Sequence, residues 1–194
     1  MIFESVKFIK SSLKAKDCPQ KDIPEFTFIG RSNVGKSSLI NMVTKKKIAK
    51  VSGNPGKTLL INHFLINNNW YLVDLPGYGY AKISKKEKRK IKNIIVDYFK
   101  NRVNLLLTFV LIDIRHELQT IDLDFIEWLS NNNINFKIIF TKADKLKTNQ
   151  KDEKAKKYIK TLFKKIKISP ENIISSSKSK LGREEIINLI YSEL

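Results

Sequence analysis

The sequence predicts an α/β protein with three layers, in which helices cover both faces of a mostly parallel central sheet. Strand-like and helix-like segments alternate along the chain from residue 25 to the end. A continuous apolar run at 105–114 (LLLTFVLIDI) is typical of a parallel strand that is buried on both faces. A chain of 194 residues is long enough to bury one such core, so we expect a single domain over residues 1–194.

Three strands and two helices are expected in the first half of the chain. Residues 25–30 (EFTFIG) alternate and are rich in β-forming residues, and 36–46 carries apolar residues at helical spacing. Two strands at 59–66 and 70–75 flank a turn at 67–69 (NNN). A long helix is expected at 85–102, and its inward-facing residues are Ile91, Ile94, Ile95, Tyr98 and Phe99.

The second half continues the alternation. The strand at 105–114 is followed by a helix at 121–131, a strand at 135–144 and an amphipathic helix at 151–166 with a basic outer face. A short strand at 171–177 and a helix at 183–194 complete the chain. Because ligands of such folds bind at the carboxyl ends of the strands, the segments that follow each strand are the candidates for a site.

The composition fits a globular protein in a reducing compartment. Apolar residues make up 42% of the chain, and no apolar stretch has the length of a membrane span. The first residues (MIFESVKFIK) lack the features of a signal peptide. Cys18 is the only cysteine, so no internal disulfide can form, and an inert thiol near a turn is a better interpretation than a reactive one.

The net charge of +18, from 37 basic and 19 acidic residues, favours a polyanionic partner such as RNA. Nearly all of the basic residues are lysine, and isoleucine and asparagine are also abundant. All three have A/T-rich codons, so a biased genome could account for much of the excess. Both explanations stay open on the sequence alone.

A phosphate-binding pattern lies between the first expected strand and helix. GRSNVGKS at 30–37 has the spacing G-x-x-x-x-G-K-[ST], in the strand–loop–helix context that supports it. Gly30 and Gly35 allow a tight turn that directs backbone N–H groups at phosphate oxygens, and the helix adds its positive N-terminal end. Lys36 is then expected to contact the outer phosphates, and the Ser37 hydroxyl to bind Mg²⁺.

Three further polar stretches follow later strands. DLPG at 74–77 offers an acid that can hold Mg²⁺ through water and a glycine N–H that can contact a γ-phosphate. TKAD at 141–144 offers Asp144, whose carboxylate can accept hydrogen bonds from guanine N1–H and the 2-amino group, which adenine lacks on that edge. The Lys142 stem can cover the base, and SSSK at 175–178 can brace it through backbone N–H groups.

Together these motifs resemble those of the translation-factor-related GTPases, and more closely the EngB/YihA/YsxC family of bacterial ribosome-assembly GTPases. The closer resemblance is carried by PEFTFIGRSNVGKSSLIN, GNPGKT, LVDLPGYGYAK, LIDIRHELQTIDLDFIEWL and TKADKL, and it covers all but the N-terminal twenty or so residues. It implies a cytoplasmic, monomeric protein that binds GTP and GDP with Mg²⁺ and hydrolyses GTP. It also implies a role in maturing the large ribosomal subunit, with precursor rRNA and ribosomal proteins as partners, and a link to cell division.

The resemblance assigns the site motif by motif. Phosphate binding is assigned to Gly30, Arg31, Ser32, Asn33, Val34, Gly35, Lys36 and Ser37. The first switch is assigned to Gly56, Lys57, Thr58, Leu59 and Leu60, and the second switch to Asp74, Leu75, Pro76 and Gly77. Guanine binding is assigned to Thr141, Lys142, Ala143, Asp144, Ser176, Ser177 and Lys178. Mg²⁺ is assigned to Ser37 and Thr58, and catalysis to Lys36, Thr58 and Asn33. Three consecutive serines leave the register of the last motif open by one residue.

Hydrolysis is expected to be slow. Tyr78 follows DLPG, where many regulatory GTPases place a glutamine that orients the attacking water. Arg31 is a candidate arginine finger or a surface arginine. Asn33 is a candidate K⁺ ligand by analogy with related GTPases, or a residue that favours the turn.

Two flexible-looking segments are expected to respond to the γ-phosphate. They are 50–58, which includes Thr58, and 77–82 (GYGYAK). Tyr78 and Tyr80 could be exposed and stack on RNA bases or pack on a partner, or they could pack in the core.

Two other functions compete with that of a GTP-controlled assembly factor. A P-loop NTPase or kinase acting on a small substrate would need a substrate pocket or lid that we cannot place in this chain. A basic RNA-binding module with a vestigial site is disfavoured because every phosphate- and guanine-contacting residue type is present.

Overall fold

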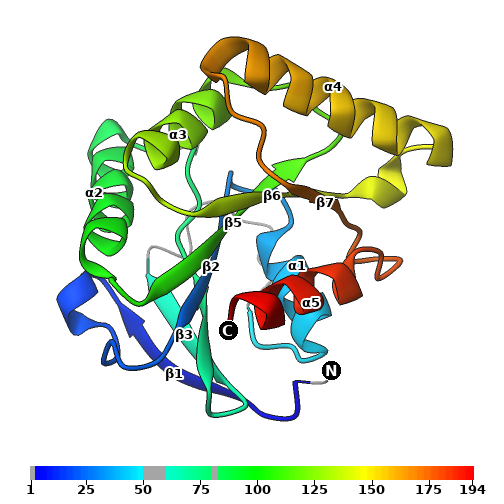
Figure 1. Cartoon of the computed structure of the whole chain (residues 1–194). Coiled ribbons are helices and arrows are strands. Elements are labelled where there is room, and N and C mark those ends of the chain that lie inside the picture. Colours follow the sequence, from blue (N-terminus) through cyan, green and yellow to red (C-terminus); the bar gives the residue numbers. More distant parts are fainter. Residues whose placement is uncertain (1–2, 50–59, 80–82) are drawn as a thin grey trace.

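The computed structural model describes residues 3–49, 60–79 and 83–194 of the chain. Its sheet has the strand order β1-β3-β4-β2-β5-β6-β7 (Figure 1). The strands are β1 (Val6–Ser12), β2 (Glu25–Gly30), β3 (Ile61–Ile66), β4 (Trp70–Asp74), β5 (Leu105–Asp113), β6 (Phe136–Thr141) and β7 (Asn172–Ile174). The α-helices are α1 (Lys36–Thr44), α2 (Lys85–Asn101), α3 (Thr120–Asn131), α4 (Thr148–Ile166) and α5 (Arg183–Glu193), with short 3₁₀ helices η1 (Ala15–Asp17) and η2 (Ala143–Lys145).

The sheet is mostly parallel, as predicted. β4, β2, β5, β6 and β7 pair in parallel, and β3 and β1 add an antiparallel edge. The parallel strands therefore bring the segments after Gly30, Asp74, Asp113 and Thr141 to the same edge of the sheet.

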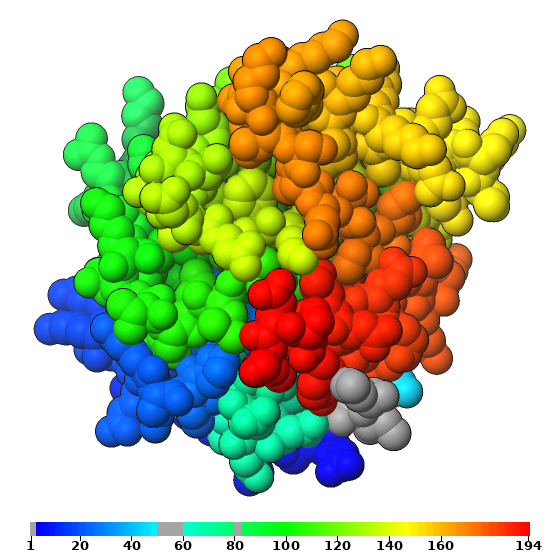
Figure 2. Space-filling model, in the orientation of Figure 1, coloured from blue at the N-terminus to red at the C-terminus, as the bar shows by residue number. Residues whose placement is uncertain are grey.

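Helices cover both faces of the sheet (Figure 1). Residues of α2, α3 and α4 form one buried cluster with one face of the sheet, and residues of α1 and α5 form a second cluster with the other face. β5 contributes alternate residues to the two clusters, for example Val110 to the first and Phe109 and Leu111 to the second. Figure 2 shows the second face, with α5 in red near its centre.

The alternation of strands and helices is confirmed, and so is the inward face of α2. Ile91, Ile94, Ile95, Tyr98 and Phe99 are all buried, because they lie on one side of the helix at spacings of three and four. A serine–glutamate capping box at Ser84 and Glu87 sets the start of α2. No helix in the described part of the chain is long and apolar enough to cross a membrane.

Several predicted boundaries were wrong, among them the start of α4, which is Thr148 rather than 151, and the end of α1, which is Thr44 rather than 46. β6 ends at Thr141 rather than 144, because Lys142 adopts a left-handed conformation (φ 62°) that opens η2. The last strand is only Asn172–Ile174, and β3 begins at Ile61 rather than 59. β1 was missed, since its alternation is weak and five of its seven residues are exposed at the edge of the sheet.

A buried charged cluster joins β2, β3 and α2. The Glu25 carboxylate accepts hydrogen bonds from Arg102, from the Tyr98 hydroxyl at 2.7 Å and from His63 Nε2 at 3.1 Å. All four side chains are buried, so the carboxylate is satisfied by protein groups rather than by water.

Candidate functional site

The loop between β2 and α1 has the conformation that a phosphate-binding loop requires. Gly30 lies so close to β5 that a Cβ there would be 2.7 Å from the Leu111 carbonyl oxygen. Gly35 has φ 104° and precedes the first residue of α1, whose N-terminus receives no side-chain cap. The first N–H groups of α1 are therefore available to an anion at the loop.

Lys36 and Asp74 meet beside this loop. The Lys36 ammonium forms an ion pair with the Asp74 carboxylate at the end of β4, and their side chains are 11% and 6% exposed. Lys36 opens α1 after β2 and Asp74 ends β4, so the two groups meet at the ends of two paired parallel strands. A phosphate that drew Lys36 away would leave the Asp74 carboxylate available to a hydrated cation.

The phosphate loop is directly hydrogen-bonded to the segment after β4. Ser32 N–H donates to the Tyr78 carbonyl at 3.1 Å, and Tyr78 N–H donates to the Gly30 carbonyl at 3.1 Å. Arg31 and Tyr78 thereby form a short parallel bridge. A displacement of the second switch would therefore break or shift hydrogen bonds of the phosphate loop.

Tyr78 is buried, so of the alternatives that the sequence left open for its ring, packing in the core is confirmed. Its ring packs on Phe125 at a centroid distance of 4.5 Å, and its hydroxyl donates to Asp122 at 3.0 Å. Burial and the neighbouring Asp122 carboxylate raise the pKa of the Tyr78 phenol well above its ordinary value, so the hydroxyl keeps its proton. Tyr80 lies outside the described residues.

Arg31 is directed to the start of α3. Its Nε lies 3.1 Å from the Asp122 carboxylate, and its Nη1 donates to Gln119 at 2.5 Å. Because one carboxylate contacts both side chains, the candidate arginine finger Arg31 and Tyr78, which replaces the usual glutamine, are both tied to α3.

The TKAD motif contacts the phosphate loop directly. The Thr141 hydroxyl donates to the Val34 carbonyl at 2.7 Å, and Lys142 Nζ donates to the Asn33 carbonyl at 2.6 Å. Asn33 itself is exposed and left-handed, with φ 63°. The Lys142 side chain thus extends from the end of β6 to the phosphate loop, and its predicted contact with the base stays a prediction.

Asp144 and the serine-rich motif face each other. The Ser176 hydroxyl donates to Asp144 Oδ1 at 2.7 Å, and this bond lowers the pKa of Asp144. Ser175 instead faces inward, where its hydroxyl donates to the Phe140 carbonyl at 2.9 Å. The geometry favours the register in which Ser176, not Ser175, is the first residue beside the acid.

Sequence reasoning missed the role of Asp113. This acid ends β5 and lies 3.0 Å from Lys142 Nζ, and it accepts two further hydrogen bonds from Arg115 at 2.9 and 2.7 Å. Burial alone would raise the pKa of Asp113, but the hydrogen bonds from Arg115 and Lys142 lower it to about 2. The only sign of this contact in the sequence is that a single acid follows an apolar strand.

One groove of about 840 Å³ joins the phosphate loop to the guanine motifs. Gly35, Thr141, Lys142, Asp144, Ser177 and Lys178 line it, and lysines after α1 extend one side. Of the other assigned residues, Ser37 is half-buried in the first turn of α1, Leu60 precedes β3, and Leu75, Pro76, Gly77 and Ala143 are buried. Gly56, Lys57, Thr58 and Leu59 lie outside the described residues.

Comparisons with known proteins agree with this geometry. Residues 25–142 match the family model described as "50S ribosome-binding GTPase". The chain is 54% identical to a probable GTP-binding protein EngB of Phocaeicola vulgatus over 97% of this chain and 94% of that protein. It is 52% identical to that of Christiangramia forsetii over 98% and 96%.

A crystal structure of a probable GTP-binding protein engB superposes with a TM-score of 0.69 at 28% identity, covering 87% of this chain and 97% of that one. A second solved structure shares the fold, with a TM-score of 0.70 at 19% identity, covering 89% of this chain and 57% of that one. It is Era in complex with MgGDPNP and nucleotides 1506–1542 of 16S ribosomal RNA. The chain thus belongs to the EngB family of P-loop GTPases, which bind GTP and hydrolyse it to GDP and phosphate.

Proposed function

We propose that this chain is a GTP-controlled switch that acts on a precursor of the large ribosomal subunit, in the cytoplasm and as a single monomeric GTP-binding domain. The observation that carries the proposal is the match over residues 25–142 to a family described by its binding to the 50S ribosome. A net charge of +18 also suits a particle made largely of RNA. A link to cell division rests on the family resemblance alone.

Guanine recognition is assigned to Asp144. Its carboxylate lines the groove, and Ser176 holds it in place through a hydrogen bond of 2.7 Å. Two acceptor oxygens at this point match the two donors on the Watson–Crick edge of guanine, whereas adenine would leave them unpaired. The contacts of Thr141 and Lys142 with the phosphate loop fix the distance between base and phosphate subsites.

Magnesium is assigned to Ser37 and Thr58, with Asp74 acting through water. Hydroxyl and carboxylate oxygens are the donors that this hard cation prefers. Ser37 lies next to Lys36, whose ammonium pairs with the Asp74 carboxylate. A cation for the phosphate (Lys36) and oxygen groups for Mg²⁺ (Ser37 and Asp74) are therefore close together. Bound Mg²⁺ would neutralise charge on the outer phosphates during transfer to water.

Slow hydrolysis by the isolated chain follows from the positions of Tyr78 and Arg31. Both side chains are bonded to Asp122 and so are directed to α3. The group that completes catalysis must then come from elsewhere, and two sources are K⁺ held by Asn33 and the ribosomal partner. The left-handed conformation of Asn33 also suits its alternative role as a turn residue.

Co-sedimentation with large-subunit particles tests the switch. The protein is loaded with a GTP analogue, with GDP or with no nucleotide, at a salt concentration that releases it from free RNA. Retention should be strongest in the GTP state and should be lost in Thr58→Ala. Retention that ignores the nucleotide and follows only ionic strength would refute the switch.

A further inference from the structure

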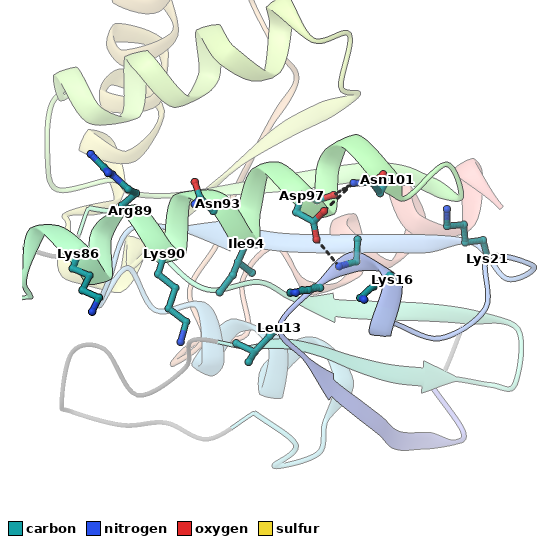
Figure 3. Close-up of a pocket in the computed structure, with 12 residues that line it drawn as sticks. Leu13, Lys16, Lys21, Lys86, Arg89, Lys90, Asn93, Ile94, Asp97 and Asn101 are labelled. Atoms are coloured by element: carbon teal, nitrogen blue, oxygen red, sulfur yellow. Dashed lines mark hydrogen bonds between the residues drawn. The ribbon is translucent and has the colours of Figure 1, made fainter.

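A second groove lies away from the nucleotide site, between α2 and the segment that includes η1. It has a volume of about 750 Å³ and runs along α2 (Figure 3). Six of its lining residues are cationic: Lys14, Lys16, Lys21, Lys86, Arg89 and Lys90. Since none of these belongs to a motif of the nucleotide site, their clustering needs a separate explanation.

These six cations are not neutralised by any acid in residues 3–49, 60–79 and 83–194. None of their side chains forms an ion pair with another residue of the described chain, although lysines elsewhere do, as Lys157 does with Glu117 at 2.6 Å. The one acid in the lining, Asp97, accepts hydrogen bonds from Ala15 N–H at 2.7 Å and Asn101 at 3.0 Å. The groove therefore carries an uncompensated positive potential.

The arrangement suits a chain of phosphates. Lys86 and Lys90 lie one helical turn apart and project to the same side of α2, with Lys16 on the opposite wall (Figure 3). Four residues of helix advance by about 6 Å, so successive charges can contact successive phosphates of one strand. Like charges at this spacing destabilise a helix unless an anion lies between them.

The rest of the lining favours RNA over an anionic membrane. Asn93 supplies an amide group that can hydrogen-bond a sugar hydroxyl, and the exposed Leu13 supplies apolar contact for the sugar. A flat bilayer cannot follow the concave surface between two walls, whereas a single strand can lie in it.

We infer that this groove binds the phosphate backbone of RNA. The inference names a contact surface for the partner of the proposed function, and it rests on that function only in taking the RNA to be ribosomal. Lys86 and Lys90 lie in the first two turns of α2, a few residues after the DLPG motif, so bound RNA would contact an element that directly follows the second switch.

The test compares two triple variants with the same loss of charge. Lys16→Gln/Lys86→Gln/Lys90→Gln removes cations from both walls of the groove. Lys160→Gln/Lys164→Gln/Lys165→Gln removes three exposed lysines of α4 that likewise form no ion pair within the described chain. Binding of a short labelled RNA strand is measured against salt, with guanine-nucleotide affinity and thermal unfolding as checks on the fold.

The groove variant should lose about a hundredfold in RNA affinity near 0.1 M salt, because each lost phosphate contact forfeits about 0.7 of a released counterion. Its salt slope should fall by about 2, and the α4 variant should stay within about threefold of the wild type. Equal losses in the two variants would overturn the inference, since net charge would then explain the binding. So would a groove variant that keeps its RNA affinity but loses binding to anionic phospholipid vesicles.

The two proposals fail separately. If the groove variant loses RNA affinity while retention of the wild type on particles does not depend on the nucleotide, RNA binding in the groove is supported and the switch is refuted. If the groove variant binds RNA as the α4 variant does, the groove falls whatever the particles do.

Discussion

Replacing Glu25 by glutamine should destabilise the protein strongly, although Glu25 lies at the opposite end of β2 from the phosphate loop. The carboxylate is fully buried and accepts hydrogen bonds from Arg102, Tyr98 and His63. Glutamine keeps the shape but removes the charge, which leaves the Arg102 guanidinium buried without a counterion. Breaking a buried pair in this way costs about 3–5 kcal/mol.

The pKa of Glu25 gives a second measure of the same cluster. Burial alone would raise this pKa, but hydrogen bonds from His63 and Arg102 outweigh it and lower the pKa from 4.5 to about 2. Each pKa unit corresponds to about 1.4 kcal/mol, so the ionised carboxylate contributes roughly 3 kcal/mol to folding. A lowered carboxyl pKa stabilises the fold above the unfolded value, so this contribution is present above pH 4.5 and lost as the pH falls towards 2.

Urea unfolding at neutral pH measures the loss, and thermal unfolding should show a midpoint lower by about 10 °C for a chain of this size. Glu117→Gln is the matched control, because Glu117 pairs with Lys157 on the surface, where the side chains are 81% and 68% exposed. That variant should unfold like the wild type. If Glu25→Gln lowers the free energy of unfolding by less than about 1 kcal/mol, the reasoning is refuted. It is also refuted if the free energy of unfolding of the wild type stays constant when the pH is lowered from 4.5 towards 2.

Three predictions concern the nucleotide site. Asp144→Asn should shift preference from guanosine towards xanthosine triphosphate in competition binding, because the amide donates where guanine needs an acceptor; equal binding of ATP and GTP by the wild type would contradict the assignment. Lys36→Ala should weaken GTP binding by about 10–100-fold, since a charged hydrogen bond is lost, and Ser37→Ala should do so only when Mg²⁺ is present; unchanged calorimetric affinities in both would mean that the loop is not the site. Phosphate release should be slow and should rise when K⁺ replaces Na⁺, unless Asn33 is changed to alanine; a rate indifferent to both leaves Asn33 as a turn residue.

The sequence predicted the elements whose cause is local. Apolar periodicity identified the inward face of α2, and spacing located the loop at 30–37, because both depend on residues near one another in the chain. For the contacts of Thr141 with Val34 and of Ser176 with Asp144, the sequence predicted only that the ends of neighbouring strands would lie close together. Their partners and distances depend on how the parallel strands align.

What the sequence could not predict depends on contacts between distant segments. Nothing in the sequence around Tyr78 indicates that its hydroxyl will donate a hydrogen bond to Asp122 or that its ring will pack on Phe125. β1 is held by its pairing with β3 and not by its own pattern, which is mostly exposed. The groove beside α2 likewise joins residues some seventy positions apart, and its cations were seen in the sequence only as a net charge.

The central claim is that guanine nucleotide and ribosomal particle bind to one chain with coupled free energies. Linkage requires that a particle which prefers the GTP form also tightens GTP binding by the same factor, and couplings of this kind are typically about 5–150-fold. The most direct measurement is the affinity for a fluorescent GTP analogue and for GDP, with and without saturating large-subunit particles. We predict that the particles tighten binding of the GTP analogue at least about fivefold relative to GDP. Affinities for both nucleotides that are unchanged by the particles would contradict the account.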